Sequence, residues 1–397
     1  MTSEWRTIRA ADFIDFNPRL SLKKGDIATK VAMDKLKPFT KKIPETEKAE
    51  FNGGAKFCNG DTVMARITPC LENGKTAYVD MLDDGEIGFG STEFIVMRAK
   101  TGISDPQFVY YTAINPVFRN VAIKSMVGSS GRQRVQQSVL EELELSVPDL
   151  DEQRRIGDFL ARIDEKIALN DRINDNLMQH AVTIFKSWFV EYSPFDGIEP
   201  KEWETVNLEK ITSLISRGIA PKYSDNSDQI VINQKCIRNH MIDLSQARTH
   251  TPKVINEKWL RFGDLLINST GDGTLGRAAQ VWFQPQNITV DSHVTVVRPA
   301  KENLIFYIGL WGVLHEREIE SLHTGSTGQT ELPKERVKAL ELHLPDNGTL
   351  DCFNTLIAPM AAAIVSKQNE NNKLATLRDA LLPKLMSGEI DVSAVQL

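Results

Sequence analysis

The feature that most constrains the fold is a long helical stripe that occurs twice in the chain. Residues of one stripe recur at alternating intervals of four and three between Ile156 and Trp188, which aligns their side chains along one side of a helix. The same spacing returns 197 positions later, between Phe353 and Leu385. Two such helices predict a helix–helix seam with these members: Ile156, Leu160, Ile163, Ile167, Asn174, Leu177, Ile357, Met360, Ile364, Asn371 and Leu374.

Polar residues interrupt both stripes near the middle. Asn170 and Asn174 in the first copy correspond to Lys367 and Asn371 in the second. Polar residues on a buried seam lower stability but fix the register and the partner of a helix. We therefore expect this layer to set how the two helices pair. Pro383, late in the second copy, predicts a bend or a restart of that helix.

The duplication extends over most of the chain, in the same order in both halves. Glu202–Val206 repeats Glu4–Ile8, and Gly263-Asp264 repeats Gly60-Asp61. Further matches pair "EFIVMR" (93–98) with "HVTVVR" (293–298), "GSSGRQRV" (128–135) with "GSTGQTEL" (325–332), and "LSVP" (145–148) with "LHLP" (342–345). Chance similarity does not preserve order and spacing in this way, so the chain is a tandem of one unit: a globular domain followed by a long helix.

Each globular half combines short β-rich runs, such as "TVMARI" and "DLLINS", with helical segments near 107–124 and 302–321. The fold class is therefore predicted to be α+β: two similar mixed α/β globular domains joined by two long antiparallel coiled-coil helices, in a pseudo-twofold arrangement. The predicted domains are residues 1–148 and 195–345, and the predicted long helices are residues 149–194 and 346–397.

Two unlike heads at the ends of one rod suit duplex DNA, whose backbone has its own pseudo-twofold symmetry. A helix of this length measures roughly 50 Å and spans on the order of fifteen base pairs. That span accommodates two half-sites and a gap. The alternative is a two-headed, non-enzymatic scaffold or adaptor that binds other proteins through its helices.

Three segments make the chain resemble the specificity subunits of type I restriction–modification systems. They are "VPDLDEQRRIGDFLARIDEKIALNDRIN" (147–174), "LLPKLMSGEI" (381–390) and the repeated "GSSGRQ" and "GSTGQT" before each helix. The resemblance implies two target-recognition domains, each of which reads one half of a bipartite, asymmetric DNA site. It also implies that the helices set the gap and dock two methyltransferase subunits. Motor/nuclease subunits would join the complex for restriction.

The same resemblance assigns the cofactors to other chains. S-adenosylmethionine, ATP and magnesium would belong to the partner subunits, and this chain would hold no cofactor and catalyse no reaction. The N-terminal residues carry no apolar signal region, and no stretch looks apolar enough for a membrane span, so we expect a cytoplasmic protein with no membrane partner. Four scattered cysteines and seven histidines show no metal-binding spacing.

Charge is the property that fits DNA binding least well. The formal net charge is −6, and neither globular half is basic. Because phosphate neutralisation normally supplies most non-specific affinity, we predict that the chain alone binds DNA poorly and that the assembled complex binds it well.

The small polar loops 128–131 and 325–328 are the first candidates for DNA contact, because their backbone can approach phosphates closely. Arginine and glutamine side chains beside them suit base edges or phosphates, although a solvated surface turn explains them equally well. The residues after the repeated Gly-Asp strand are weaker candidates. The candidate DNA-binding residues are Arg66, Ser129, Ser130, Arg132, Gln133, Arg134, Ser269, Thr270, Ser326, Thr327 and Gln329.

Two motifs suggest catalysis but lack the context that it needs. "GDGTLG" (271–276) matches a dinucleotide fingerprint, but "RAAQVWF" after it predicts a strand where that motif needs a helix. "NPVF" (115–118) echoes amino-methyltransferases, yet it lacks their second proline and any preceding glycine-rich donor site, so we interpret it as a helix break. These gaps count against a standalone methyltransferase.

Overall fold

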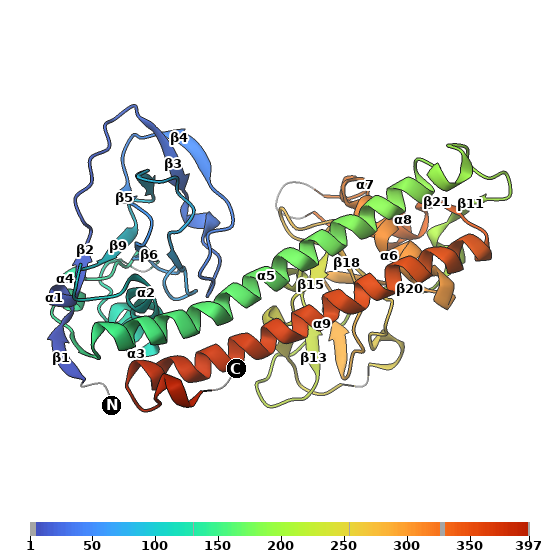
Figure 1. Cartoon of the computed structure of the whole chain (residues 1–397). Helices are drawn as coiled ribbons and strands as arrows, with labels where there is room; N and C mark the ends of the chain where they lie inside the picture. The colour runs from blue at the N-terminus through green and yellow to red at the C-terminus, as the bar shows by residue number, and fades with distance from the viewer. Residues whose placement is uncertain (1–4, 130, 254, 326–329, 396–397) are drawn as a thin grey trace. The chain divides into compact units, whose positions relative to one another are not determined.

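The computed structural model describes residues 5–129, 131–253, 255–325 and 330–395, and it divides into two compact units. Unit 1 comprises Met1–Asn170 and Glu370–Leu397, and unit 2 comprises Asp171–Asn369. Each unit contains part of both long helices, α5 (Leu150–Phe189) and α9 (Asn347–Met386) (Figure 1). The structure therefore divides each helix between the units, whereas the sequence suggested separate spacer segments.

Unit 1 carries a head, here called head 1, that precedes α5 in the chain. Strands β1 (Arg6–Arg9) and β10 (Glu144–Val147) form a two-stranded ladder. One four-stranded sheet has the order β2 (Ile14–Phe16), β9 (Phe94–Ala99), β6 (Thr62–Ala65), β7 (Thr76–Tyr78). A second four-stranded sheet has the order β4 (Glu47–Glu50), β3 (Ile27–Val31), β8 (Gly88–Gly90), β5 (Ala55–Phe57). The helices of head 1 are α1 (Ala10–Phe13), η1 (Met33–Lys35), α2 (Pro106–Ile114), α3 (Pro116–Lys124) and α4 (Gln137–Glu141), and η8 (Val392–Ala394) follows α9.

Unit 2 carries head 2, which lies between α5 and α9 in the chain. Strands β11 (Glu204–Asn207) and β21 (Glu341–Leu344) form a two-stranded ladder, and β14 (Ile237–Arg238) pairs with β15 (Met241–Ile242). A four-stranded sheet has the order β12 (Thr212–Arg217), β20 (Val294–Pro299), β17 (Leu265–Asn268), β18 (Ala278–Gln280). A three-stranded sheet has the order β16 (Arg248–Thr249), β13 (Ile230–Ile232), β19 (Ile288–Val290). The helices of head 2 are η2 (Ser193–Phe195), η3 (Leu208–Ile211), η4 (Gln234–Cys236), η5 (Leu244–Gln246), η6 (Asn256–Lys258), η7 (Glu302–Leu304), α6 (Ile305–Leu314), α7 (Glu316–Ser321) and α8 (Lys334–Lys338).

The sequence duplication is a duplication of topology. The order β2-β9-β6-β7 in head 1 matches the order β12-β20-β17-β18 in head 2, and the ladder β1–β10 matches β11–β21. Each head also contains one parallel pair, β3–β8 or β13–β19. The predicted strand runs are β6, β9, β17 and β20, and the predicted helix break at Asn115-Pro116 separates α2 from α3. The α+β fold class with two similar heads is confirmed.

The aspartate of the repeated Gly-Asp motif is buried and forms an ion pair with an arginine in both heads. In head 1 the Arg98 guanidinium donates from Nε and Nη2 to the two Asp61 oxygens, at 2.7 Å each. In head 2 Arg298 donates to Asp264 in the same way, at 2.7 Å each. Both pairs join the strand that follows the Gly-Asp turn to its neighbour, β9 or β20. The motif is thus a structural tie within each head.

Within unit 1 the two long helices run antiparallel, because contacts advance along α5 as they recede along α9. Arg378 Nη1 donates to Asp164 Oδ1 at 2.6 Å, and Asn170 Nδ2 donates to Asn371 Oδ1 at 2.8 Å. Asn371 Nδ2 also donates to the Ile167 carbonyl at 3.3 Å. The predicted polar layer is therefore formed by Asn170 and Asn371, and the seam residues Ile156, Leu160 and Ile163 are buried above it.

In unit 2 the buried stripe departs from the predicted one by a single position. Leu177 and Met360 are only partly buried, and the adjacent Met178 and Ala361 occupy the core instead. A straight helix has 3.6 residues per turn, so a strict 3.5-residue stripe drifts around its surface. Leu177 and Met360 therefore lie at the edge of the buried stripe and pack against the core, whereas Ile357 and Ile364 are fully buried as predicted.

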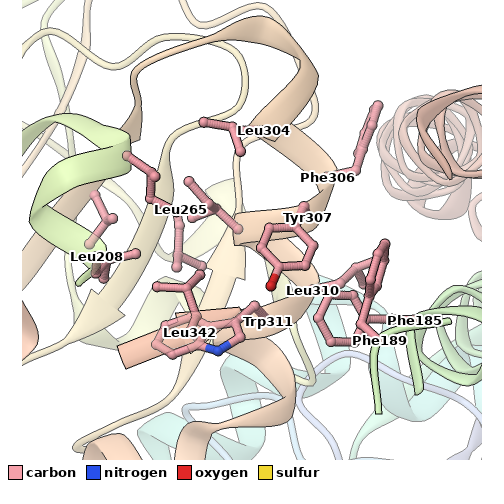
Figure 2. Close-up of a cluster of buried hydrophobic side chains, with 14 of the residues drawn as sticks. Phe185, Phe189, Leu208, Leu265, Leu304, Phe306, Tyr307, Leu310, Trp311 and Leu342 are labelled. Carbon is pink, nitrogen blue, oxygen red and sulfur yellow. The ribbon is translucent and has the colours of Figure 1, made fainter. Parts of the chain in front are cut away.

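The shifted stripe of α5 enters the core of head 2. Phe185 and Phe189 point from α5 toward Tyr307 of α6, with ring centroids 5.5 and 4.9 Å from the tyrosine ring (Figure 2). Phe353 of α9 packs 4.8 Å from Phe189. Side chains of α5, α9 and head 2 therefore form one continuous hydrophobic core where the helices contact the head.

Helix α9 differs from two expectations. It continues through Pro383 to Met386, so the restart that this proline predicted does not occur. Among the described residues it is also the helix that is long and apolar enough to cross a membrane by length and composition alone. Leu350, Phe353 and Ile357 lie in the core of unit 2, and a core helix passes the same test.

Candidate nucleic-acid interface

The loop before α4 in head 1 is closed by backbone bonds at its base. Val127 and Arg134 exchange N–H to carbonyl bonds of 3.0 and 2.9 Å, and the Arg132 N–H donates to the Ser129 carbonyl at 3.0 Å. Ser129 and Arg132 are exposed, whereas Gln133 is half-buried and its N–H donates to Thr68 Oγ1 at 3.0 Å. Ser129 and Arg132 therefore remain candidates for DNA contact, and Ser130 lies outside the described residues.

Arg134 is an ion-paired residue. Its guanidinium donates to the Glu93 carboxylate at 2.6 to 3.0 Å from two nitrogens. The guanidinium beside Glu93 holds the pKa of that carboxyl below its ordinary value. Because the pair is already neutral at physiological pH, Arg134 offers less to a phosphate than its sequence position suggested.

Arg66 lies at the wall of a cleft in head 1. The cleft has a volume of about 570 Å³, and Arg19, Lys56 and Arg66 bring three cationic side chains to it. The remaining lining residues are Asn17, Pro18, Leu20, Gly54, Ala55, Thr92, Phe94 and Val96. A polar cleft with three cations suits an anionic ligand such as a DNA backbone.

The backbone holds Arg66 between the cleft and the loop 127–135. Its N–H donates to the Glu93 carbonyl at 2.9 Å, and its carbonyl accepts from the Val135 N–H at 2.9 Å. Its side-chain Nε is buried and has no hydrogen-bond partner among the described residues. A buried guanidinium N–H without a hydrogen-bond partner lowers the stability of the folded protein. The Nε–H of Arg66 is therefore available to donate to a ligand.

The corresponding position in head 2 is Ser269, and it is fully buried. Its hydroxyl is bonded to Thr295 Oγ1 at 2.6 Å, and its carbonyl accepts from the Leu332 N–H at 2.8 Å. A side chain with no exposed surface cannot reach DNA, so Ser269 was wrongly placed among the DNA contacts. Thr270 is half-buried, and its hydroxyl is bonded to His293 Nδ1 at 2.8 Å.

The loop of head 2 has the same closure with the charges reversed. Thr324 and Glu331 exchange backbone bonds of 2.8 and 2.9 Å, as Val127 and Arg134 do in head 1. Glu331 here accepts from the Arg217 guanidinium, so the loop carries the acid and β12 carries the cation. The candidates Ser326, Thr327 and Gln329 lie outside the described residues. The two loops therefore share one backbone arrangement but carry residues of opposite charge at its base.

Arg19 and Lys56 are interface residues that the sequence did not indicate. They lie far apart in the chain and outside the repeated motifs, and only the folding of β5 beside the segment after β2 brings them to one cleft. The Lys56 ammonium donates to the Leu20 carbonyl at 3.0 Å and lies 5.0 Å from the Phe51 ring centroid.

The remaining motifs have structural roles. The glycine loop 271–276 leads into strand β18, so it lacks the helix of a dinucleotide site, as predicted. Among the residues that the structure describes, no group of three or more His, Cys, Asp or Glu side chains is placed to hold a metal ion.

His250 in head 2 makes folding sensitive to pH. It is fully buried, and within the described chain neither ring nitrogen has a hydrogen-bond partner. Burial lowers the pKa of His250 below its ordinary value. Since the folded state binds this proton less readily than the unfolded state, stability is retained above about pH 6.5 and is lost as the pH falls below it, by less than about 1.4 kcal/mol per pH unit.

We therefore expect His250→Leu to reduce the loss of unfolding free energy that occurs when the pH is lowered. Chemical denaturation of unit 2, measured at about pH 7.5 and about pH 5.5, should show a smaller loss in the variant than in the parent. His180→Leu, at an exposed histidine of α5, is the control and should leave the loss unchanged. Equal acid sensitivity in His250→Leu and the parent would contradict the assignment.

Comparison with known proteins places these features in one context. The family model for the type I restriction modification DNA specificity domain matches residues 3–179 and again residues 200–358. The specificity subunit of the type I restriction enzyme MjaIX from Methanocaldococcus jannaschii is 26% identical over 68% of this chain and 66% of its own length, just under two thirds. The HindI specificity subunit from Haemophilus influenzae is 22% identical over 83% of this chain and 86% of its own length.

A solved structure shares the fold. The type I restriction–modification S subunit from M. genitalium aligns over 96% of both chains with a TM-score of 0.57 and 14% sequence identity.

Proposed function

The chain belongs to the type I restriction modification DNA specificity family, and from this premise we propose that it is the sequence-specific DNA-recognition subunit of a type I restriction–modification complex. Each head reads one half of a bipartite, asymmetric DNA site. The observation that carries the proposal is the double match of the family model, once on each of two units with the same strand order.

The asymmetry of the site follows from the difference between the heads. Head 1 has the cationic cleft with Arg66, whereas head 2 has the buried Ser269 at the equivalent position. The ion pair at the loop base is also reversed, with Arg134–Glu93 in head 1 and Arg217–Glu331 in head 2. Surfaces that differ in this way select different half-sites, although the frames beneath them are alike.

The catalytic steps belong to partner subunits in this proposal. Exposed apolar side chains on α5 and α9, such as Leu169, Leu356 and Leu377, support a role of the helices in docking two methyltransferase subunits. Motor/nuclease subunits join for restriction. S-adenosylmethionine, ATP and magnesium are then bound by those partners in the cytoplasm, and this chain contributes recognition alone.

The isolated chain is expected to bind DNA weakly. With a net charge of −6, its affinity at physiological salt should lie in the non-specific range of roughly 1–100 µM, whereas the complex with methyltransferase subunits should reach roughly 10 nM or tighter on its own site. Fluorescence anisotropy with one duplex, with and without the partners, measures both. Nanomolar binding by the chain alone would contradict the prediction that tight binding needs the methyltransferase subunits.

The proposed function is tested by mapping methylated adenines across the host genome with and without this chain. A single bipartite motif should be methylated in the parent and should disappear when the chain is deleted. Restoring the chain with head 2 exchanged for another should change one half of the motif and preserve the other. A methylation map that is unchanged by the deletion would favour the protein-binding adaptor.

A further inference from the structure

A buried lysine in head 1 is held by neutral groups. Lys41 is 4% exposed, and its ammonium donates to Gln107 Oε1 and to the Tyr111 hydroxyl, the latter at 3.4 Å. The ammonium also lies 5.2, 5.5 and 5.0 Å from the ring centroids of Tyr78, Tyr110 and Tyr111. Three aromatic faces around one ammonium stabilise its charge by cation–π attraction.

The Lys41 site continues through Tyr111 to both long helices. The Tyr111 hydroxyl, on α2, donates to Asp164 Oδ2 of α5 at 2.6 Å. The other oxygen of Asp164 accepts from Arg378 Nη1 of α9 at 2.6 Å. Asp164 and Arg378 are each 6% exposed. One buried chain of contacts therefore runs from the segment after η1 through α2 to α5 and α9, all inside unit 1.

The charge on Lys41 determines which groups donate and which accept in this chain of hydrogen bonds. An ammonium has donors only, so the Tyr111 oxygen must accept from Lys41 and direct its own proton to Asp164. A neutral amine has a lone pair that competes with Asp164 for that proton. Deprotonation of Lys41 therefore weakens the bond between α2 and α5 without removing any side chain.

We propose that Lys41 and Tyr111 are positioning residues that fix the orientation of head 1 on the helix pair through Asp164 and Arg378. This inference rests on the proposed function, because a head that reads a half-site must be held at a constant angle to the helices that set the gap. Loss of the chain of contacts loosens the head and weakens discrimination at the first half-site, whereas affinity for unrelated DNA is retained.

The proposed positioning role has a pH signature. Burial lowers the pKa of Lys41 to about 8, and repulsion from Lys42 acts in the same direction. Attraction from Asp164, Glu165 and Asp80 opposes this shift. The other titratable or charged groups at the site are Tyr78, Tyr110, Tyr111, Arg378 and Asp379. Burial raises the pKa of each tyrosine, so none of the three ionises near neutrality. Lys41 is therefore the group in this set that changes charge near pH 8.

Stability and recognition are then expected to change in opposite directions. Because the folded pKa of Lys41 lies below its unfolded value, the folded state binds fewer protons, and stability rises with pH from about 8 to about 10.5. Discrimination between half-sites falls as the folded protein loses the Lys41 proton, around pH 8. A general loosening of the fold would lower both, so the opposite signs separate a positioning role from a structural one.

The test uses the complex with its methyltransferase subunits and two duplexes, the methylated motif found by genome mapping and a copy with the first half-site scrambled. Wild-type discrimination should fall about tenfold as the pH rises through about 8, the effect of losing one buried hydrogen bond. Tyr111→Phe should show that loss already at neutral pH. Tyr110→Phe, which deletes a neighbouring hydroxyl outside the chain of contacts, should behave as wild type.

The outcomes separate the two proposals. If the wild-type complex does not distinguish the two duplexes at any pH, the proposed function fails. If it distinguishes them equally from about pH 7 to about pH 9, the positioning role of Lys41 is overturned without recourse to any variant. Equal discrimination by Tyr111→Phe and Tyr110→Phe overturns the role of Tyr111.

Discussion

Asp264→Asn is expected to lower the free energy of unfolding of unit 2 by about 3–5 kcal/mol, because it leaves a buried guanidinium without its counter-charge. Asp264 and Arg298 have side-chain exposures of 0% and 7%. Arg298 also donates to the carbonyls of Glu257 and Trp259 at 2.9 and 2.7 Å, so its head group cannot move to solvent without breaking these bonds. Denaturant titration followed by tryptophan fluorescence measures the loss, since five of the six tryptophans lie in unit 2.

The duplicated pair in head 1 provides an internal control. Arg98 is 27% exposed, so water can solvate it when Asp61→Asn removes its partner, and we expect a smaller loss there. A double variant, Asp264→Leu with Arg298→Met, should recover most of the stability, because an apolar pair of similar size replaces a buried ion pair at little cost. If the double variant is as unstable as Asp264→Asn, the loss does not arise from an uncompensated charge.

The fold could be predicted because its main features are repeated or periodic in the sequence. The stripe from Ile156 to Trp188 identified α5, and its copy identified α9. The repeated short runs identified β6, β9, β17 and β20. The register error in unit 2 has a physical cause: periodicity fixes which face of a helix is apolar to within about one residue, and the aromatic core around Tyr307 selects Phe185 and Phe189 from that face.

The candidate site was harder to predict because side-chain availability depends on distant residues. Arg134 seemed free in the sequence, yet Glu93, 41 positions away, pairs with it. Ser269 is polar and follows a repeated strand, yet the fold buries it against Thr295. Lys41 carries no local signal, since the tyrosines that surround it come from β7 and α2. Arg66, which follows a repeated strand, does line a cleft of head 1, and its contact with DNA stays a prediction.

Arg66→Ala should weaken binding of the assembled complex to its own site by about 1–3 kcal/mol, or roughly five- to 150-fold. The physical reason is that the Nε of Arg66 is buried beside a cationic cleft and has no partner among the described residues, so we expect a DNA group to accept its hydrogen bond. Electrophoretic mobility shift or anisotropy with the cognate duplex measures the change. A loss confined to the cognate sequence indicates a base contact, and an equal loss on unrelated DNA indicates a phosphate contact.

Arg134→Ala is the matched comparison, because it removes the same charge from the segment that bonds to the backbone beside Arg66. Its guanidinium is already neutralised by Glu93, so we expect a change well below that of Arg66→Ala. The contrast decides between two accounts of recognition in this head. If affinity followed net charge, the two variants would be equivalent; if it follows the cations that the fold leaves unpaired, Arg66 dominates. A larger loss in Arg134→Ala than in Arg66→Ala would place the DNA on the loop 127–135 and away from the cleft.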